Sequence, residues 1–204
     1  MARLSETGDS RRTDTRARIL TVALRLFAER GYATTSLREI AEELGVTKAA
    51  LYFHYRTKED IVSGILRGYT DGVQSLLDAY EGTTPTLAAR ERLLRDFAAL
   101  QAQWGGDLTK LIRQNYTEVV NLPAGGEIKQ SHHRLIDALA GPAPTVLDRT
   151  RAVAALATLQ SAAMPVENVD EQTRREAALV VSLEVLRACG SPHPPASAGR
   201  GGST

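Results

Sequence analysis

The sequence predicts an all-α protein, and three observations support this. Apolar residues recur at helical spacing, glycine and proline separate the periodic stretches, and no segment alternates convincingly at period two.

The 204 residues are 43% hydrophobic and 24% charged, which suffices for a core in a dissolved protein. No apolar run reaches the roughly 18 residues of a membrane span, and no secretory signal is recognised. The single cysteine cannot form an intramolecular disulfide. We therefore expect a cytoplasmic protein.

The first helix is expected over about residues 14–30, with Gly31 as its terminator. Its apolar face has i, i+3, i+4, i+7 spacing and consists of Leu20, Ala23, Leu24 and Phe27. The polar segment 1–12 before it is interpreted as a flexible basic arm. Arg11 and Arg12 in this arm suit a DNA minor groove, and the alternative is a solvated tail.

Two short helices follow, joined by a very tight turn. Ser36 and Glu39 form a predicted capping box for a helix over residues 37–44, and Gly45 offers the left-handed backbone that ends it. Thr47 then caps a helix over residues 48–54. This pattern fits a helix-turn-helix whose second helix enters the DNA major groove, although a plain helical hairpin uses similar spacing.

A long helix begins at Lys58 behind Thr57 and runs for about six turns, long enough to bridge two domains. Glycines recur at every fourth position along it, at residues 64, 68 and 72. We interpret them as a site of close helix packing. The alternative is that they make this helix easier to bend or tilt. Further helices are expected over residues 87–104, 108–119 and 128–139. The breaks between them are Gly105-Gly106, Pro123 to Gly126, and Gly141 to Pro144.

The last two helices, over residues 152–164 and 177–186, are apolar almost all round. A helix without a polar face needs cover on both sides, so we expect a homodimer formed through these two helices. The alternative is a central helix in a monomer. Residues 191–204 are rich in proline, glycine and serine and are expected to form a disordered tail.

The segment GYATTSLREIAEELGVTKAALYFHYRTKE, residues 31–59, closely resembles the signature of the tetracycline-repressor (TetR) family of transcriptional regulators. The resemblance covers about residues 13–62 and extends loosely to the length and the helical layout. It implies about nine helices, with a DNA-binding domain at residues 13–57 and a ligand-binding and dimerisation domain at residues 58–190. The C-terminal part carries no family motif.

The resemblance also implies which residues contact DNA. The matching positions are Thr35, Ser36, Arg38, Thr47, Lys48, Ala49, Ala50, Tyr52, His54 and Lys58. Lys48 is expected to donate hydrogen bonds to guanine O6 or N7, and the two alanines to contact thymine methyl groups. Tyr52, His54 and Lys58 are expected to bind phosphate oxygens. Many relatives have glycine where this chain has Ala49, which affects how closely the backbone approaches DNA. The position of Tyr55 is often an aromatic residue of the small core.

Candidates for the ligand pocket are aromatic and polar residues on or beside the apolar faces of the middle helices. They are Phe97, Gln101, Trp104, Tyr116, His132, Gln160 and Met164. His132 has a second interpretation as a hydrogen-bonded core histidine. Adjacent histidines on a helix point about 100° apart, so His132 and His133 do not predict a metal site. No cofactor motif and no catalytic motif is recognised.

The sequence therefore predicts a homodimeric transcriptional repressor, released from a palindromic double-stranded DNA operator by an unidentified small hydrophobic inducer. Two alternatives stay open. One is a helical small-molecule-binding or sequestering protein without sequence-specific DNA binding, and the other is a helical enzyme with an unrecognised site.

Overall fold

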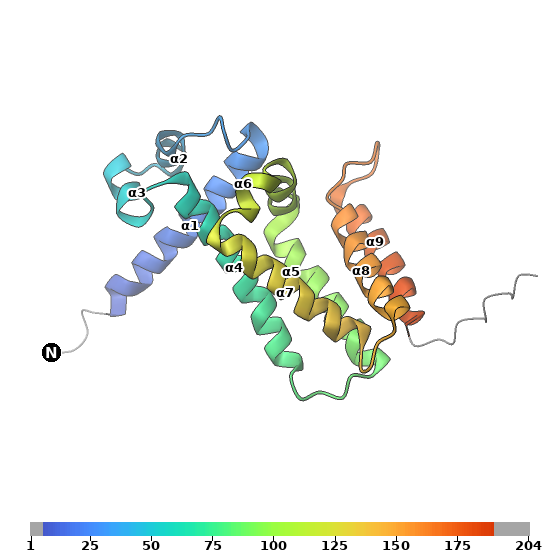
Figure 1. The fold of residues 1–204 in the computed structure, drawn as a ribbon. Helices are drawn as coiled ribbons and strands as arrows, with labels where there is room; N and C mark the ends of the chain where they lie inside the picture. Colours follow the sequence, from blue (N-terminus) through green and yellow to red (C-terminus); the bar gives the residue numbers. More distant parts are fainter. Residues whose placement is uncertain (1–5, 190–204) are drawn as a thin grey trace, which may run out of the picture.

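A computed structural model describes residues 6–189, which form nine α-helices (Figure 1). Their bounds are α1 Glu6–Arg30, α2 Leu37–Leu44, α3 Lys48–His54, α4 Lys58–Tyr80, α5 Leu87–Gln114, α6 Tyr116–Val120, α7 Pro123–Ala140, α8 Val146–Ser161 and α9 Glu171–Arg187. The all-α prediction with about nine helices is confirmed. The predicted disordered tail at residues 191–204 lies outside the described residues.

Helix α1 begins at Glu6 rather than near Asp14, so the expectation of a flexible arm over residues 1–12 is wrong for residues 6–12. Residues 6–13 contain no proline, and polar side chains are compatible with helical backbone hydrogen bonding. The apolar periodicity on which the prediction depended begins only where α1 meets the core, from Ile19 onward. Residues 1–5 lie outside the described part of the chain.

Helices α1, α2 and α3 form the head of the molecule, with α2 and α3 joined by the predicted turn. The Ser36 and Thr47 caps and the capping box with Glu39 are present, and Gly45 adopts the left-handed conformation at φ 68°. Ala41 and Leu51 are buried in the head. These local signals confirm the helix-turn-helix geometry.

Tyr55 is buried behind α3, where the sequence predicted a core aromatic. Its hydroxyl accepts a hydrogen bond from Arg16 Nε at 2.9 Å, and the guanidinium carbon lies 5.3 Å from the ring centroid. The phenol thereby joins the end of α3 to α1.

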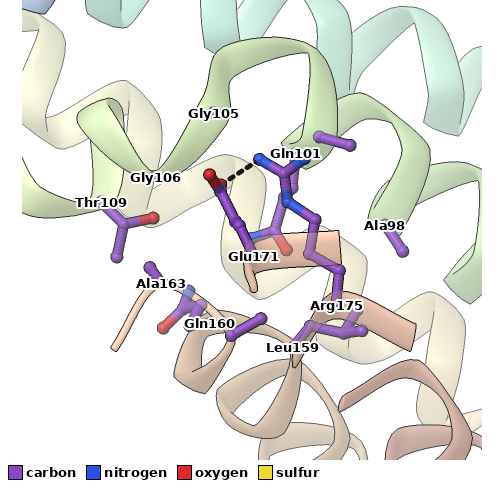
Figure 2. Close-up of a pocket in the computed structure, with 12 residues that line it drawn as sticks. Ala98, Gln101, Gly105, Gly106, Thr109, Leu159, Gln160, Ala163, Glu171 and Arg175 are labelled. Carbon is purple, nitrogen blue, oxygen red and sulfur yellow. Dashed lines mark hydrogen bonds and ion pairs between the residues drawn. The ribbon is translucent and has the colours of Figure 1, made fainter. Parts of the chain in front are cut away.

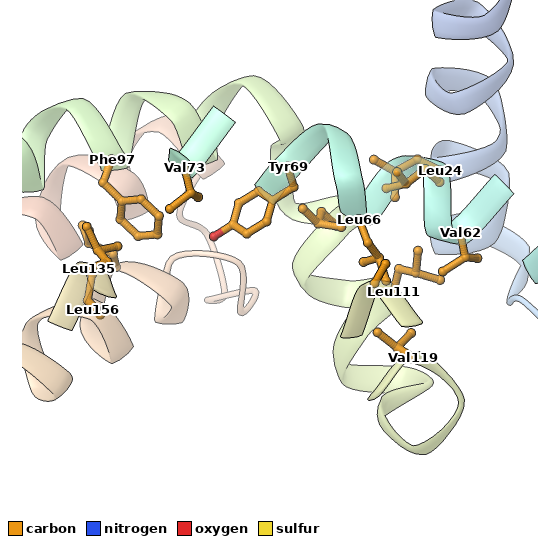
Figure 3. Packing of buried hydrophobic residues seen from close by; sticks show 14 of the residues in the cluster. Leu24, Val62, Leu66, Tyr69, Val73, Phe97, Leu111, Val119, Leu135 and Leu156 are labelled. Atoms are coloured by element: carbon orange, nitrogen blue, oxygen red, sulfur yellow. The ribbon is translucent and has the colours of Figure 1, made fainter. Parts of the chain in front are cut away.

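Helix α4 continues from the head into the rest of the molecule, and its glycines mark close packing. A Cβ built on Gly68 would lie 3.0 Å from the Trp104 ring, and one on Gly72 would lie 2.9 Å from Leu100 Cδ1. Both neighbours belong to α5. The close-packing interpretation of the glycine repeat is therefore confirmed. Buried side chains follow α4 as one cluster from Leu24 and Val62 to Tyr69 and Phe97 (Figure 3).

The expected breaks in the middle of the chain have different outcomes. Gly105 interrupts α5 as a kink with φ 65° and ψ −178°, at the predicted stop. Residues 123–126 do not break the chain, because Pro123 is the first residue of α7. Proline suits that position since the first turn of a helix uses no backbone N–H there.

Helices α8 and α9 lie side by side, slightly apart from the bundle of α4, α5 and α7 (Figure 1). The buried Ser182 Oγ on α9 donates to the Ala155 carbonyl of α8 at 2.9 Å. The opposite side of the pair is apolar and exposed, with Val153 48% and Val180 56% accessible. Both helices begin about a turn or more before the predicted ranges, because charged and polar residues in their first two turns interrupt the apolar pattern.

Candidate functional site

Helix α3 directs one residue into the head and most others outward. Leu51 is fully buried, whereas the exposed residues are Lys48, Ala49, Ala50, Tyr52 and Phe53. Lys48 Nζ lies 5.3 Å from the centroid of the Tyr52 ring, so the cation and the phenol occupy one surface. His54, at the end of the helix, is half-buried. The predicted reading residues of this helix therefore lie on an accessible surface.

Phe53 is a candidate that the sequence analysis missed. Its side chain is 68% exposed and packs edge-on against His54, with ring centroids 5.4 Å apart. Such exposure of a phenylalanine is unusual. The signal in the sequence was its position two residues after Leu51, which turns it away from the core side of the helix.

Of the three residues predicted to contact DNA at the start of α2, two are exposed and one is buried. Ser36 and Arg38 are exposed, and Arg38 Nε forms an ion pair with Glu42 at 2.7 Å. Thr35 is only 1% exposed, and its hydroxyl donates to the Gly31 carbonyl at 2.8 Å. The expected DNA contact by the Thr35 side chain is therefore corrected to a structural role, since its hydroxyl is used inside the head.

Lys58 occupies an unexpected position at the start of α4. Its ammonium donates to the carbonyls of Tyr32 at 2.6 Å and Ala33 at 3.2 Å, and lies 4.6 Å from the Tyr32 ring centroid. Lysine has three N–H donors, so one remains for an outside acceptor. Lys58 thus ties α4 to the turn between α1 and α2, and its phosphate contact stays a prediction.

A cavity of about 920 Å³ lies between α4, α5, α7 and α8 and includes residues of α6. Six of the predicted pocket residues line it: Gln101, Trp104, Tyr116, His132, Gln160 and Met164. Phe97 does not line it. The Phe97 ring is fully buried, and its centroid is 6.5 Å from that of His132. Phe97 lies about one helical turn before Gln101, the first residue of α5 that lines the cavity.

Tyr69 and His132 form the polar centre of the cavity wall. Tyr69 Oη lies 3.2 Å from His132 Nε2, and the Tyr69 ring packs edge-on against Trp104 at 6.3 Å. Burial raises the pKa of Tyr69 to about 12, opposed by a hydrogen bond with Gln101. Burial, and secondly the neighbouring His133, lower the pKa of His132. Both groups are therefore neutral at physiological pH. Both interpretations of His132 therefore apply, because its ring is hydrogen-bonded to Tyr69 and it also lines the cavity.

Several lining residues were missed by the sequence analysis. They are Tyr69 of α4 and the basic residues Lys110, Arg113, Lys129 and His133. Their spacing was the available signal. Lys110 and Arg113 are three residues apart on α5, and Lys129 and His133 are four apart on α7, so each pair shares a helix face.

A smaller hollow of about 50 Å³ adjoins the cavity at the α5 kink (Figure 2). It shares Gln101, Gly105 and Gln160 with the larger cavity. On its far side Glu171 and Arg175 form an ion pair on α9 (Figure 2). The Glu171 carboxylate beside this hollow is therefore neutralised by the Arg175 guanidinium.

The side chains described by the structure, at residues 14–117, 119 and 121–189, include no group of three His, Cys, Asp or Glu that could hold a metal ion. None of the helices described has the length and apolar character to cross a membrane.

Comparison of the sequence with known proteins concerns mainly the head. Residues 19–65 match the family described as "Bacterial regulatory proteins, tetR family". The HTH-type transcriptional regulator AcrR of Shigella flexneri is 42% identical over 72 residues, which are 35% of this chain and 34% of AcrR. The matched segment thus spans about a third of that relative's length.

Comparison of the structure extends over most of the chain. The regulator PfmR of Thermus thermophilus, described as a TetR family transcriptional regulator, has a TM-score of 0.66 at 23% identity, covering 83% of this chain and 97% of PfmR. AibR, solved with isovaleryl coenzyme A and operator DNA, has a TM-score of 0.62 at 19% identity, covering 81% of this chain and 96% of AibR. At these identities the likeness establishes the shared fold.

Proposed function

We propose that this chain, whose residues 19–65 match the tetR family of bacterial regulatory proteins, is a ligand-responsive transcriptional repressor. In this proposal a homodimer in the cytoplasm binds a palindromic operator and leaves it when a small molecule occupies the cavity. The proposed repressor uses no cofactor. The observation that carries the proposal is the accessible surface of α3, joined by the single helix α4 to the wall of the cavity.

The exposed side chains of α3 support DNA binding. Lys48 provides donors for guanine, Ala49 and Ala50 provide methyl groups for thymine, and Tyr52 provides a hydroxyl for phosphate. Phe53 adds an apolar surface for a thymine methyl group or a sugar. Half-sites read in this way by a two-fold dimer are about 34–36 Å apart, or a multiple of this.

The exposed apolar surface of α8 and α9 supports the dimer. Val146 and Val153 lie seven residues apart on α8, and Val180 and Val181 lie on α9. A second copy turned by a two-fold axis would bring the same valines against each other and remove them from water. Dimerisation here leaves both heads accessible to DNA.

Helix α4 supports the coupling between ligand and DNA. At its first residue Lys58 holds the turn between α1 and α2, and three turns later Tyr69 contacts His132 in the cavity wall. Gly68 between them packs against Trp104, which also lines the cavity. A ligand that moves Trp104 or His132 therefore acts on α4 directly, and a tilt of α4 changes the spacing of the heads. AibR, of the same fold, was solved with both an acyl thioester and operator DNA.

The proposal is tested by selecting bound duplexes from a random DNA library and then following the affinity against salt. We expect enrichment of a palindrome whose half-sites are one helical turn or more apart, with affinity that falls steeply as salt rises. A folded dimer that enriches no sequence would contradict the proposal. That outcome would support a small-molecule-binding or sequestering protein instead.

A further inference from the structure

The lining of the large cavity is unbalanced in charge. It includes Lys110, Arg113 and Lys129, which are cationic at neutral pH, and also the two histidines of α7. It includes no aspartate or glutamate among the described residues. A cavity surrounded by one sign of charge concentrates ligands of the opposite sign.

These three cations are not neutralised by described neighbours. Among the residues whose side chains the structure describes, 14–117, 119 and 121–189, no ion pair involves Lys110, Arg113 or Lys129. Asp107 is near Lys110, but it does not line the cavity, and burial is the first cause that raises its pKa. Elsewhere on the surface, by contrast, arginines of α5, α8 and α9 pair with carboxylates. The positive charge of the cavity is therefore a local property.

Charge and apolar surface are also separated in depth. Tyr69, Leu108 and Val119 form the buried part of the wall, and Trp104 and Ile136 extend it. Arg113, Lys129 and His133 are exposed and so lie at the open side. A ligand that satisfies both parts has an apolar body inside and negative charge at the rim.

We propose that the cavity binds an amphiphile with an apolar body and an anionic end, either a carboxylate or a phosphate. The apolar body lies among Trp104, Leu108 and Ile136, and the anion lies between the two cations of α5, Lys110 and Arg113, and Lys129 of α7. The volume of about 920 Å³ is within the range of about 300–1,000 Å³ for small-molecule sites. This inference rests on the proposed function only in treating the bound molecule as an effector.

Trp104 provides a direct measurement of binding, because it is the only tryptophan and it lines the cavity. Its fluorescence is titrated with three probes that share a ten-carbon tail: decanoate, decanol and decylammonium, each below its micelle concentration. We expect decanoate to bind at least tenfold more tightly than decanol, since one good hydrogen bond to a charged group corresponds to about that factor. Decylammonium should bind most weakly. Added salt should weaken only the decanoate complex.

Two further probes distinguish sources of the anion. Decanoyl coenzyme A carries phosphates beyond the thioester, and coenzyme A lacks the acyl tail. Tighter binding of the thioester than of decanoate identifies a phosphate-bearing ligand, whereas tighter binding of decanoate identifies a free carboxylate. Either result supports the anionic amphiphile, while equal binding of decanoyl coenzyme A and coenzyme A would overturn the role of the apolar body.

The variants Arg113→Gln and Lys129→Gln remove one rim charge from each helix and keep a polar side chain. We expect each to weaken decanoate several-fold, and the double variant about tenfold or more, with decanol unchanged. The matched control is Arg92→Gln, an exposed arginine of α5 outside the cavity. Thermal unfolding confirms that each variant folds.

The outcomes separate this inference from the proposed function. Equal affinities for decanoate and decanol, or no response of Trp104 to any probe, would overturn the anionic site. Selective binding of decanoate that leaves operator affinity unchanged would support the site and contradict its role as the effector site. Release of the operator by decanoate, and not by decanol, would support both.

Discussion

The head and the cavity region use sequence in different ways. In the head, helix ends and buried positions are set by residues a few positions apart, such as Ser36 with Glu39 and Leu51 with Tyr55. The cavity wall instead combines α4, α5, α7 and α8, so Tyr69 meets His132 across 63 positions. The structure of the head therefore follows from residues that are close together in the sequence. The structure of the cavity depends instead on how the distant helices of the bundle assemble.

The largest expected effect comes from the head core. Leu51→Ala removes a fully buried side chain and should destabilise the protein by about 2–5 kcal/mol. If the head is specified locally, DNA binding is lost first, and Trp104 still responds to decanoate. In urea unfolding, circular dichroism reports the helices of both regions, whereas Trp104 fluorescence reports the cavity region alone. Coincident loss of both signals would show that the regions unfold together.

The second prediction separates reading from anchoring within the head. Lys48→Ala should relax base preference and cost about 1–3 kcal/mol of discrimination, without a change in stability. Lys58→Ala should weaken all sequences alike and also lower the unfolding temperature, because its ammonium holds two carbonyls of the α1–α2 turn.

These two variants are compared by binding to operator and random duplexes, together with thermal unfolding. Lys58→Arg is the control that keeps the charge. If both alanine variants lowered affinity equally and left stability unchanged, the difference in role between the two lysines would be lost.

The third prediction concerns helix capping. Ser36→Ala removes the side chain that accepts from the Glu39 backbone N–H, and should cost about 1 kcal/mol of stability. Ser36→Asp keeps an acceptor and should restore most of it. Chemical denaturation of the three proteins measures the difference, and a neutral alanine variant would argue against local specification of the head.

The smallest effect is expected in the cavity wall and depends on pH. Burial lowers the pKa of His132 from its ordinary 6.5, so the unfolded chain binds a proton that the folded protein resists. This contribution to stability is fully present above 6.5 and declines as the pH falls below it. Folding stability measured between pH 7.5 and pH 5 should therefore fall less in His132→Gln. An identical decline in both proteins would contradict this assignment.

The same contrast explains what sequence reasoning could predict. The bounds of α2 and α3 and their caps followed from residue types at fixed short spacing, because capping is a local interaction. The early start of α1 was missed because a polar helix lacks apolar periodicity. Thr35 was misplaced because the resemblance carries over a position, whereas burial depends on the neighbouring backbone.

In the cavity region the sequence supplied candidates but no arrangement. Aromatic and polar residues beside apolar faces were a useful criterion, and six of them do line the cavity. Phe97 met the same criterion and is buried, since periodicity does not distinguish a core wall from a cavity wall. The basic residues were missed because exposed cations are common on helices, and only the fold shows that four of them surround one space.

The kink at Gly105 divides α5 into two halves with different surroundings. The positive φ of 65° strongly favours glycine there, and the half beyond it carries Lys110 and Arg113, which line the cavity. Substitutions of Lys110 and Arg113 change the cavity lining and leave in place Leu100 and Trp104, which pack against the glycines of α4. Effector preference can thus diverge among descendants of this chain while the operator and the machinery that reads it are inherited unchanged.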